Sequence, residues 1–143
     1  MTYDVLDTDH LSILQRRTEP GFSILSEKLS QYSPDLIFVT IISFHEQFQG
    51  WMAYLNKSKT STHIITAYSK IEQLVHLYGI SQILSFDEKA VKITEMLKKQ
   101  RLRIGTLDLR IASIVLANNG VLLTKNTKDF AIVPNLKSED WCI

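Results

Sequence analysis

The sequence predicts an α/β sandwich with a mostly parallel sheet. Short apolar runs rich in β-branched and aromatic residues alternate along the chain with stretches of helical periodicity, as in strand–helix–strand units. No hairpin signal joins two strand runs, since Asn119-Gly120 follows a helical stretch. The chain has 143 residues, which favours one domain and permits a sizeable core. We therefore expect a single domain over residues 1–143.

The first part of the chain is expected to form two strands and four helices. Leu36–Thr40 is a continuous apolar run, which predicts a buried strand. Thr40 or Ser43 can then cap the helix that follows, and Pro20-Gly21 marks a break between helices. The expected elements are a strand at Tyr3–Leu6, helices at Asp9–Arg17 and Phe22–Leu29, a strand at Leu36–Thr40, a helix reaching about Leu55, and a helix at Thr60–Leu77.

The second part is expected to form three strands and two helices. Val91, Met96 and Leu97 are expected on the inner side of the first of these helices, and Gly120 is expected to close the second. The expected elements are a weak strand at Gln82–Phe86, helices at Asp87–Gln100 and Thr106–Asn118, a strong strand at Val121–Lys125, and an edge strand at Trp141–Ile143.

Composition excludes several classes of protein. The net charge is +1, so any binding of nucleic acid must come from a local basic patch. The one cysteine, Cys142, excludes an internal disulfide and fits a reducing compartment. No apolar run approaches the ~20 residues of a membrane-spanning helix, and Asp4 and Asp7 stand where a signal peptide would carry basic residues. We expect a cytoplasmic protein that does not enter a membrane.

Polar residues follow two of the expected strands. Asp7 comes directly after the first strand, and Thr124, Asn126 and Asp129 come after the strong strand near the end. Parallel sheets place ligands beyond the carboxyl ends of their strands, where the strand order reverses. Turn chemistry is the alternative for the later group, because Asn and Asp bond to their own backbone in turns.

Two further carboxylates are candidates for the same edge. Asp108 falls in the first turn of an almost wholly apolar helix. The alternatives are stabilisation by the helix dipole or a pair with Arg103 or Arg110. Glu46 lies opposite the apolar stripe of its helix, where a solvated glutamate is the plain interpretation, yet its neighbour one turn on is Gly50.

Carboxylates gathered at one crevice repel one another and raise each other's pKa, which a divalent cation would relieve. Oxygen ligands select hard ions, so Mg²⁺ or Mn²⁺ is expected. A zinc site is not expected, because the four histidines show no paired ligand spacing and Cys142 has no partner cysteine. The sequence also has neither a glycine-rich phosphate loop nor a nucleophile elbow.

A basic stretch runs from Lys89 to Arg110 and leads into the helix that carries Asp108. A solvated helix face is one interpretation. The other is a patch that binds RNA phosphates beside a metal site. The candidate RNA-binding residues are Lys98, Lys99, Arg101 and Arg103.

Three segments together resemble the PIN-domain family, and within it the VapC-type ribonuclease toxins. They are "LDTDHLSIL", "TIISFHEQFQG" and "RIGTLDLRIASIVLANNGVLLTKNTKDFAIVPNLKSEDW". The resemblance implies a three-layer α/β/α sandwich in which Asp7, Glu46 and Asp108 hold Mg²⁺ or Mn²⁺. Members often add a fourth acidic residue, for which Asn126 and Asp129 are both candidates, with Thr124 beside them. Asp9 is assigned as the cap of the first helix.

The resemblance also implies an activity and partners. It implies a metal-dependent endoribonuclease acting on RNA, often transfer RNA, that forms a homodimer and is silenced by a cognate antitoxin. Two other functions stay open from the sequence. "DTD" at a strand end also fits a haloacid-dehalogenase-like phosphatase, although Lys125-Asn126 is not the acidic pair of that class. A PIN-like domain that binds RNA or a partner without cutting is the second.

Overall fold

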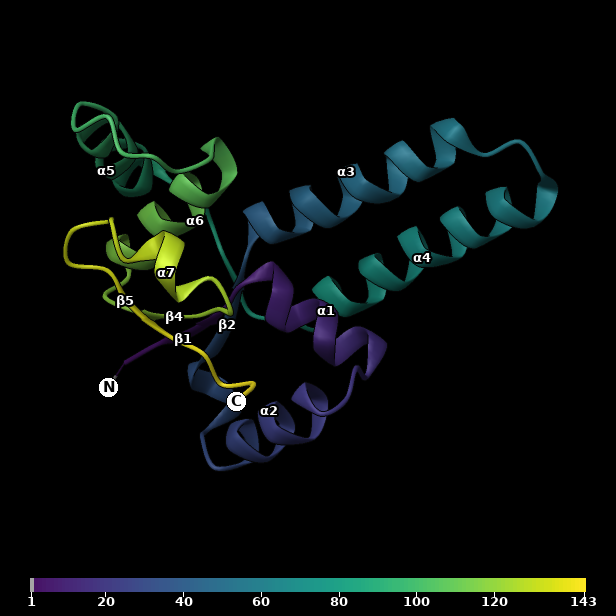
Figure 1. The fold of residues 1–143 in the computed structure, drawn as a ribbon, viewed down its shortest axis with the longest axis horizontal. Coiled ribbons are helices and arrows are strands. Elements are labelled where there is room, and N and C mark those ends of the chain that lie inside the picture. The colour runs from purple at the N-terminus through teal and green to yellow at the C-terminus, as the bar shows by residue number, and fades with distance from the viewer. Residues whose placement is uncertain (1) are drawn as a thin grey trace.

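The computed structural model describes residues 2–143 and is built around a five-stranded parallel sheet (Figure 1). The strands stand in the order β3-β2-β1-β4-β5, and all four pairings are parallel. The strands are β1 (Asp4–Leu6), β2 (Ile37–Thr40), β3 (Ile83–Leu84), β4 (Val121–Leu123) and β5 (Lys137–Glu139). β1 is central, and the chain crosses to opposite sides of it to reach β2 and β4. This reversal of strand order places a crevice at the carboxyl end of β1.

Helices cover both faces of the sheet, as the three-layer expectation requires. They are α1 (Thr8–Arg16), α2 (Gly21–Ser30), α3 (Ile41–Lys57), α4 (Ser61–Gly79), α5 (Glu88–Lys98), α6 (Thr106–Ala117) and α7 (Thr127–Phe130), with a 3₁₀ turn, η1 (Pro34–Leu36). Figure 1 shows α5, α6 and α7 on one side and α1 and α2 on the other, with α3 and α4 running outward as a long antiparallel hairpin.

Alternation of side chains along the strands divides the core in two. Val5 and Leu122 point into the cluster formed with α5 and α6. Leu6 and Leu123, one residue further on, point into the cluster formed with α1, α2 and α4. Because successive strand residues face opposite sides, β1, β2 and β4 supply side chains to both cores. These three strands are therefore covered on both faces, as parallel sheets require, whereas β5 at the edge is polar and mostly exposed.

Side-chain caps fix the starts of three helices. Thr40 accepts a hydrogen bond from the Ser43 N–H at the start of α3, Thr60 accepts one from the His63 N–H at the start of α4, and Asp87 caps α5. A cap is worth about 1 kcal/mol, because it satisfies a backbone donor that the helix cannot. The expected helix starts near 40, 60 and 87 are confirmed.

Three local expectations were wrong. The cap of α1 is Asp7, whose side chain accepts from the Thr8 N–H, so Asp9 lies inside the first turn. Met96 is 57% exposed, because it lies about 100° round the helix from buried Leu97, and Ala90 and Thr94 complete the inner face. The edge strand is β5 rather than Trp141–Ile143.

Gly120 closes α6 through its N–H, which donates to the Val115 carbonyl at 3.0 Å, and not by a left-handed conformation. That conformation falls to Asn119, at φ 53°. Gly120 is required for a different reason: a Cβ there would meet the Tyr3 carbonyl oxygen at 3.1 Å and a Val5 methyl at 3.2 Å. The close approach lets the Val121 N–H donate to the Tyr3 carbonyl at 2.8 Å and brings β4 alongside β1.

Within residues 2–143, none of the helices is long and apolar enough to cross a membrane.

Candidate active site

The carboxyl ends of β1, β2 and β4 carry the polar residues of the site. Asp7 leaves β1 and begins α1, and Thr124 follows β4. Glu46 lies in the second turn of α3, which leaves β2, and Asp108 lies in the first turn of α6. Four separate segments therefore bring their side chains to the crevice that the strand order creates.

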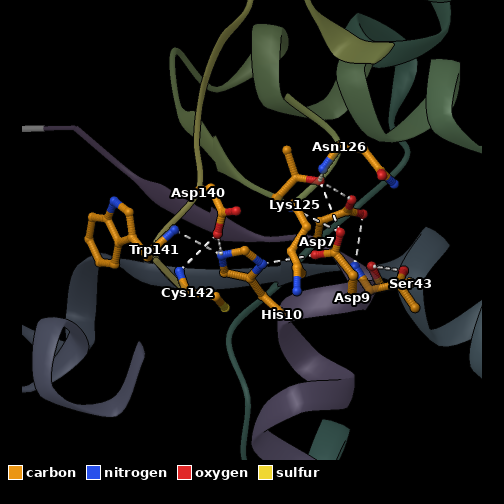
Figure 2. Close-up of polar contacts among 11 residues, drawn as sticks. Asp7, Asp9, His10, Ser43, Lys125, Asn126, Asp140, Trp141 and Cys142 are labelled. Carbon is orange, nitrogen blue, oxygen red and sulfur yellow. Dashed lines mark hydrogen bonds and ion pairs between the residues drawn. The ribbon is translucent and has the colours of Figure 1, made fainter. Parts of the chain in front are cut away.

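Asp7 is the most deeply placed of these carboxylates, with 4% of its surface exposed. One carboxylate oxygen accepts from the Thr8 N–H at 2.8 Å, and the other accepts from the Thr124 hydroxyl at 2.7 Å (Figure 2). The two bonds fix the orientation of the carboxylate. Each oxygen keeps lone pairs for a further partner.

Thr8 brings Glu46 toward Asp7. Its hydroxyl lies 2.9 Å from the Glu46 Oε1 and 3.0 Å from the Ser43 Oγ. The contact explains why Glu46 is only half-exposed although it lies opposite the apolar stripe of α3. The hydroxyl therefore links the first turn of α1 to the first two turns of α3.

Asp9 holds the loop after β4. One of its oxygens lies 2.8 Å from the His10 Nδ1, and the other accepts from the Lys125 N–H at 3.0 Å and lies 3.2 Å from the Thr124 hydroxyl. Burial alone would raise the pKa of Asp9, but the bonds from His10 and Lys125 hold it below the ordinary value. This role could not be predicted from the sequence, where only the position of Asp9 two residues after Asp7 hinted at it.

The carboxylates act on one another electrostatically. Burial, and next the charge of Asp9, raise the pKa of Asp7 to about 7, although the bonds from Thr124 and Thr8 oppose the shift. Burial is also the largest cause of the raised pKa of Glu46 and of Asp108. The Asp108 charge adds to the shift of Glu46. Negative charge is therefore concentrated at this edge, and within residues 2–143 none of Asp7, Glu46 and Asp108 forms an ion pair.

The two candidates for a fourth ligand lie on the segment after β4. The Asn126 N–H donates to the Thr124 hydroxyl at 3.0 Å, and Asn126 is the N-cap residue that precedes α7. Asp129 is exposed within α7, and its charge is the second cause, after burial, of the raised pKa of Asp108. Asp129 thus acts on the site by charge, whereas Asn126 has none to contribute.

The donor set suits a hard divalent cation, since Asp7, Glu46 and Asp108 present only oxygen. In residues 2–143 the one group of three potential ligand atoms lying within 4.8 Å of one another is elsewhere, at His10, Asp140 and Cys142. The carboxylate oxygens of Asp7, Glu46 and Asp108 therefore lie too far apart for all three to bind one ion directly in this conformation. Mg²⁺ tolerates this arrangement, because it keeps several of its waters and takes only one or two carboxylates directly.

The basic residues selected from the sequence lie at the end of α5 and in the loop that enters α6. Lys98 ends the helix, Lys99 is its C-cap, and Arg101 and Arg103 follow in the loop, all of them exposed. Within the described part of the chain none of the four forms an ion pair with a carboxylate.

Pairing of Asp108 with an arginine is likewise not found in residues 2–143. The Arg110 guanidinium instead lies 6.0 Å from the centre of the Phe86 ring. The alternative of a structural ion pair for Asp108 is therefore not supported.

Several curated proteins similar to this chain are named ribonuclease VapC. Ribonuclease VapC1 of Haemophilus influenzae strain R2866 is 31% identical over 140 residues, which is 96% of each chain. The chain belongs to the VapC family of ribonucleases. The resemblance inferred from the three sequence segments is thereby confirmed. No protein-family model matches the chain.

Solved structures agree with this VapC assignment. A chain of VapBC-1 from nontypeable Haemophilus influenzae has a TM-score of 0.74 and 26% identity, covering 98% of each chain. A chain of VapBC2 from Rickettsia felis, solved with a DNA fragment from its promoter, has a TM-score of 0.70 and 26% identity, covering 98% of this chain and 99% of that one. The similarity therefore covers the whole α/β/α sandwich rather than a fragment of it.

Proposed function

We propose that this VapC-family chain is a metal-dependent endoribonuclease and the toxin of a toxin–antitoxin pair. One observation carries the proposal: the buried Asp7, with Glu46 and Asp108 near it, stands at the sheet crevice of a chain that aligns end to end with ribonuclease VapC1. Neither a phosphatase nor a non-catalytic scaffold is favoured by these relatives.

Asp7, Glu46 and Asp108 are the proposed metal ligands, and Mg²⁺ or Mn²⁺ is the proposed ion. When bound, such an ion lowers the pKa of its water, orients that water for attack on a phosphodiester and offsets charge on the leaving oxygen. Thr124 and the Thr8 N–H hold Asp7 in one orientation, and the Thr8 hydroxyl does the same for Glu46. Positioned carboxylates of this kind need no covalent intermediate.

Asp129 is the proposed fourth acidic residue, because its charge already acts on Asp108. It can add charge to the surroundings of the metal directly or through a water. Asn126 can offer only a neutral amide oxygen, so we assign it the weaker role.

The substrate is proposed to be RNA, transfer RNA among the candidates, held beside the site by Lys98, Lys99, Arg101 and Arg103. All four are exposed and without a carboxylate partner in residues 2–143, and the loop that carries the two arginines leads directly to Asp108. Cations on such a loop can neutralise phosphates adjacent to the scissile bond.

A cognate antitoxin and a second copy of the chain are the proposed protein partners, and the cytoplasm the proposed location. Two of the similar solved structures are named VapBC-1 and VapBC2, and another is named a toxin–antitoxin complex from Klebsiella pneumoniae. The outer side of α4 exposes Ile65, Tyr68 and Val75 by 59% or more, an apolar surface of the kind that partners cover.

Cleavage of RNA by matched variants tests the proposal. Asp108→Asn should abolish cleavage in Mg²⁺ or Mn²⁺. Asp87→Asn makes the same chemical change at an exposed cap of α5, where Asn caps equally well, and should cleave like the wild type. Equal cleavage by the wild type and Asp108→Asn would contradict the assigned site. Release of phosphate from a simple monoester without RNA cleavage would indicate the phosphatase instead.

A further inference from the structure

A second group of metal-ligating side chains lies between the end of the chain and α1. His10, Asp140 and Cys142 each place a ligand atom within 4.8 Å of the other two. Figure 2 shows Asp140, Trp141 and Cys142, in the segment that follows β5, beside the His10 ring. The residues are some 130 positions apart in sequence, which is why their spacing gave no sign of a site.

His10 is already oriented as a metal-bound histidine usually is. Its ring is fully buried, and Nδ1 lies 2.8 Å from the Asp9 carboxylate. Histidines that bind a metal through one nitrogen typically donate the other N–H to a carboxylate, which fixes the tautomer and the ring. Nε2 then carries the lone pair, which accepts from the Trp141 N–H at 3.2 Å. The Asp140 Oδ1 lies 3.7 Å from Nε2 and accepts from the Cys142 N–H.

The other two groups determine which ion would fit. Cys142 supplies a soft sulfur and is the one cysteine of the chain. Asp140 supplies a carboxylate whose side chain is 15% exposed, so the group reaches solvent on one side. A set of nitrogen, oxygen and sulfur suits zinc, whereas Mg²⁺ and Mn²⁺ prefer oxygen alone.

We propose that His10 Nε2, an Asp140 carboxylate oxygen and Cys142 Sγ bind a zinc ion, with water as the fourth ligand. This site is distinct from the nuclease carboxylates and does not depend on the proposed nuclease function. Binding releases the thiol proton to solvent, because sulfur ligates as the thiolate. It also replaces the bond that the Trp141 N–H makes to Nε2 at 3.2 Å, so the backbone at Trp141 must turn away.

Zinc at this position would hold the last residues of the chain against α1. It would also affect the active site through one residue, Asp9. His10 contacts Asp9, and Asp9 accepts from the Lys125 N–H in the loop beside Asp7. Without zinc, the bond from the Trp141 N–H to His10 and the packing of Trp141 and Cys142 against Leu11 make this attachment. The zinc-free and zinc-bound proteins therefore differ in the partner of the His10 Nε2. Metal binding by the Cys142 sulfur distinguishes the two experimentally.

Cobalt(II) is a suitable probe for the full chain, because a thiolate bound to it gives a charge-transfer absorption in the near ultraviolet. Since Cys142 is the one cysteine, this band can arise only here. We expect one equivalent of the band, its displacement by zinc, and its loss in Cys142→Ser. Asp140→Asn should weaken cobalt binding at least tenfold. Glu139→Gln, which changes the neighbouring carboxylate but keeps an acceptor for the Trp141 indole N–H, should bind as the wild type does.

The absence of the thiolate band in folded wild-type protein at saturating cobalt would overturn the proposal. Equal cobalt affinity in Asp140→Asn and the wild type would overturn the ligand set. The test is independent of the nuclease proposal, because Asp108→Asn should keep the full band. As a second readout, zinc at a hundred times its Kd should shift the folded-to-unfolded ratio about a hundredfold in Asp108→Asn and not in Cys142→Ser.

Discussion

Replacing Asp7 by Asn should stabilise the metal-free protein at neutral and alkaline pH. The change removes a negative charge that is 4% exposed and surrounded by other carboxylates. The Asn side-chain oxygen can still accept from the Thr8 N–H. Its amide group faces Thr124, whose hydroxyl can turn to the Asp9 oxygen 3.2 Å away. The substitution therefore keeps the shape of the site and removes the charge.

The magnitude follows from the pKa of Asp7, which burial raises from 3.8 to about 7. The folded state binds this proton more tightly than the unfolded state, so stability is lost as pH rises from about 4 through about 7. A shift of about 3 pKa units corresponds to about 4 kcal/mol at pH 8. Loss of the Thr124 bond to a charged acceptor offsets about 1–2 kcal/mol of this. Asp7→Asn should thus be about 2–3 kcal/mol more stable than the wild type at pH 8, and no more stable near pH 4.

Urea unfolding in chelator at several pH values between 4 and 8 measures this difference. Asp87→Asn, the exposed control, should stay within about 0.5 kcal/mol of the wild type at every pH. Added Mn²⁺ should then stabilise the wild type and reduce the advantage of Asp7→Asn, because a ligand stabilises only the protein that binds it. If Asp7→Asn is instead less stable than the wild type at pH 8 in chelator, burial and the charge of Asp9 do not destabilise the ionised Asp7 carboxylate.

The remaining predictions concern the edges of the site. Asp129→Ala should reduce RNA cleavage more than Asn126→Ala does, because only the aspartate adds charge near Asp108. Initial rates of cleavage in Mn²⁺ measure the two losses. A larger loss in Asn126→Ala would make Asn126 the ligand. Combined replacement of Lys98, Lys99 and Arg101 by Ala should weaken RNA binding. It should also flatten a log–log salt slope of about −2 for single-stranded RNA, at roughly −0.7 per phosphate contact. Titrations on an inactive variant measure the slope, and an unchanged slope would mean that these cations only solvate the helix end.

Local signals in the sequence were sufficient to predict most of the helices and strands. The apolar run before Thr40 and the capping residues at 40, 60 and 87 determine their elements by short-range chemistry, and the structure places them as expected. β5 could not be found in this way. Lys137–Glu139 is polar and mostly exposed, and it is a strand only because β4 pairs with it along one edge.

Site residues that directly follow a strand could be predicted from the sequence. Those whose position depends on contacts between distant segments could not. Asp7 and Thr124 were selected by their position after β1 and β4, and they lie within a hydrogen bond of each other. Asp9 was misassigned as a cap, because its partner is the backbone of Lys125, more than a hundred residues away. The cluster at His10 depends in the same way on where the end of the chain folds.

We propose that Asp7, Glu46 and Asp108 hold a metal ion with which the protein cuts RNA. The most direct measurement is the rate of RNA cleavage by the purified chain as free Mg²⁺ or Mn²⁺ is varied, beginning in excess chelator. We predict no cleavage in chelator, a rate that rises and saturates with added metal, and no such rise for Asp108→Asn at any metal concentration. Cleavage by the wild type that is undiminished in excess chelator would contradict the account.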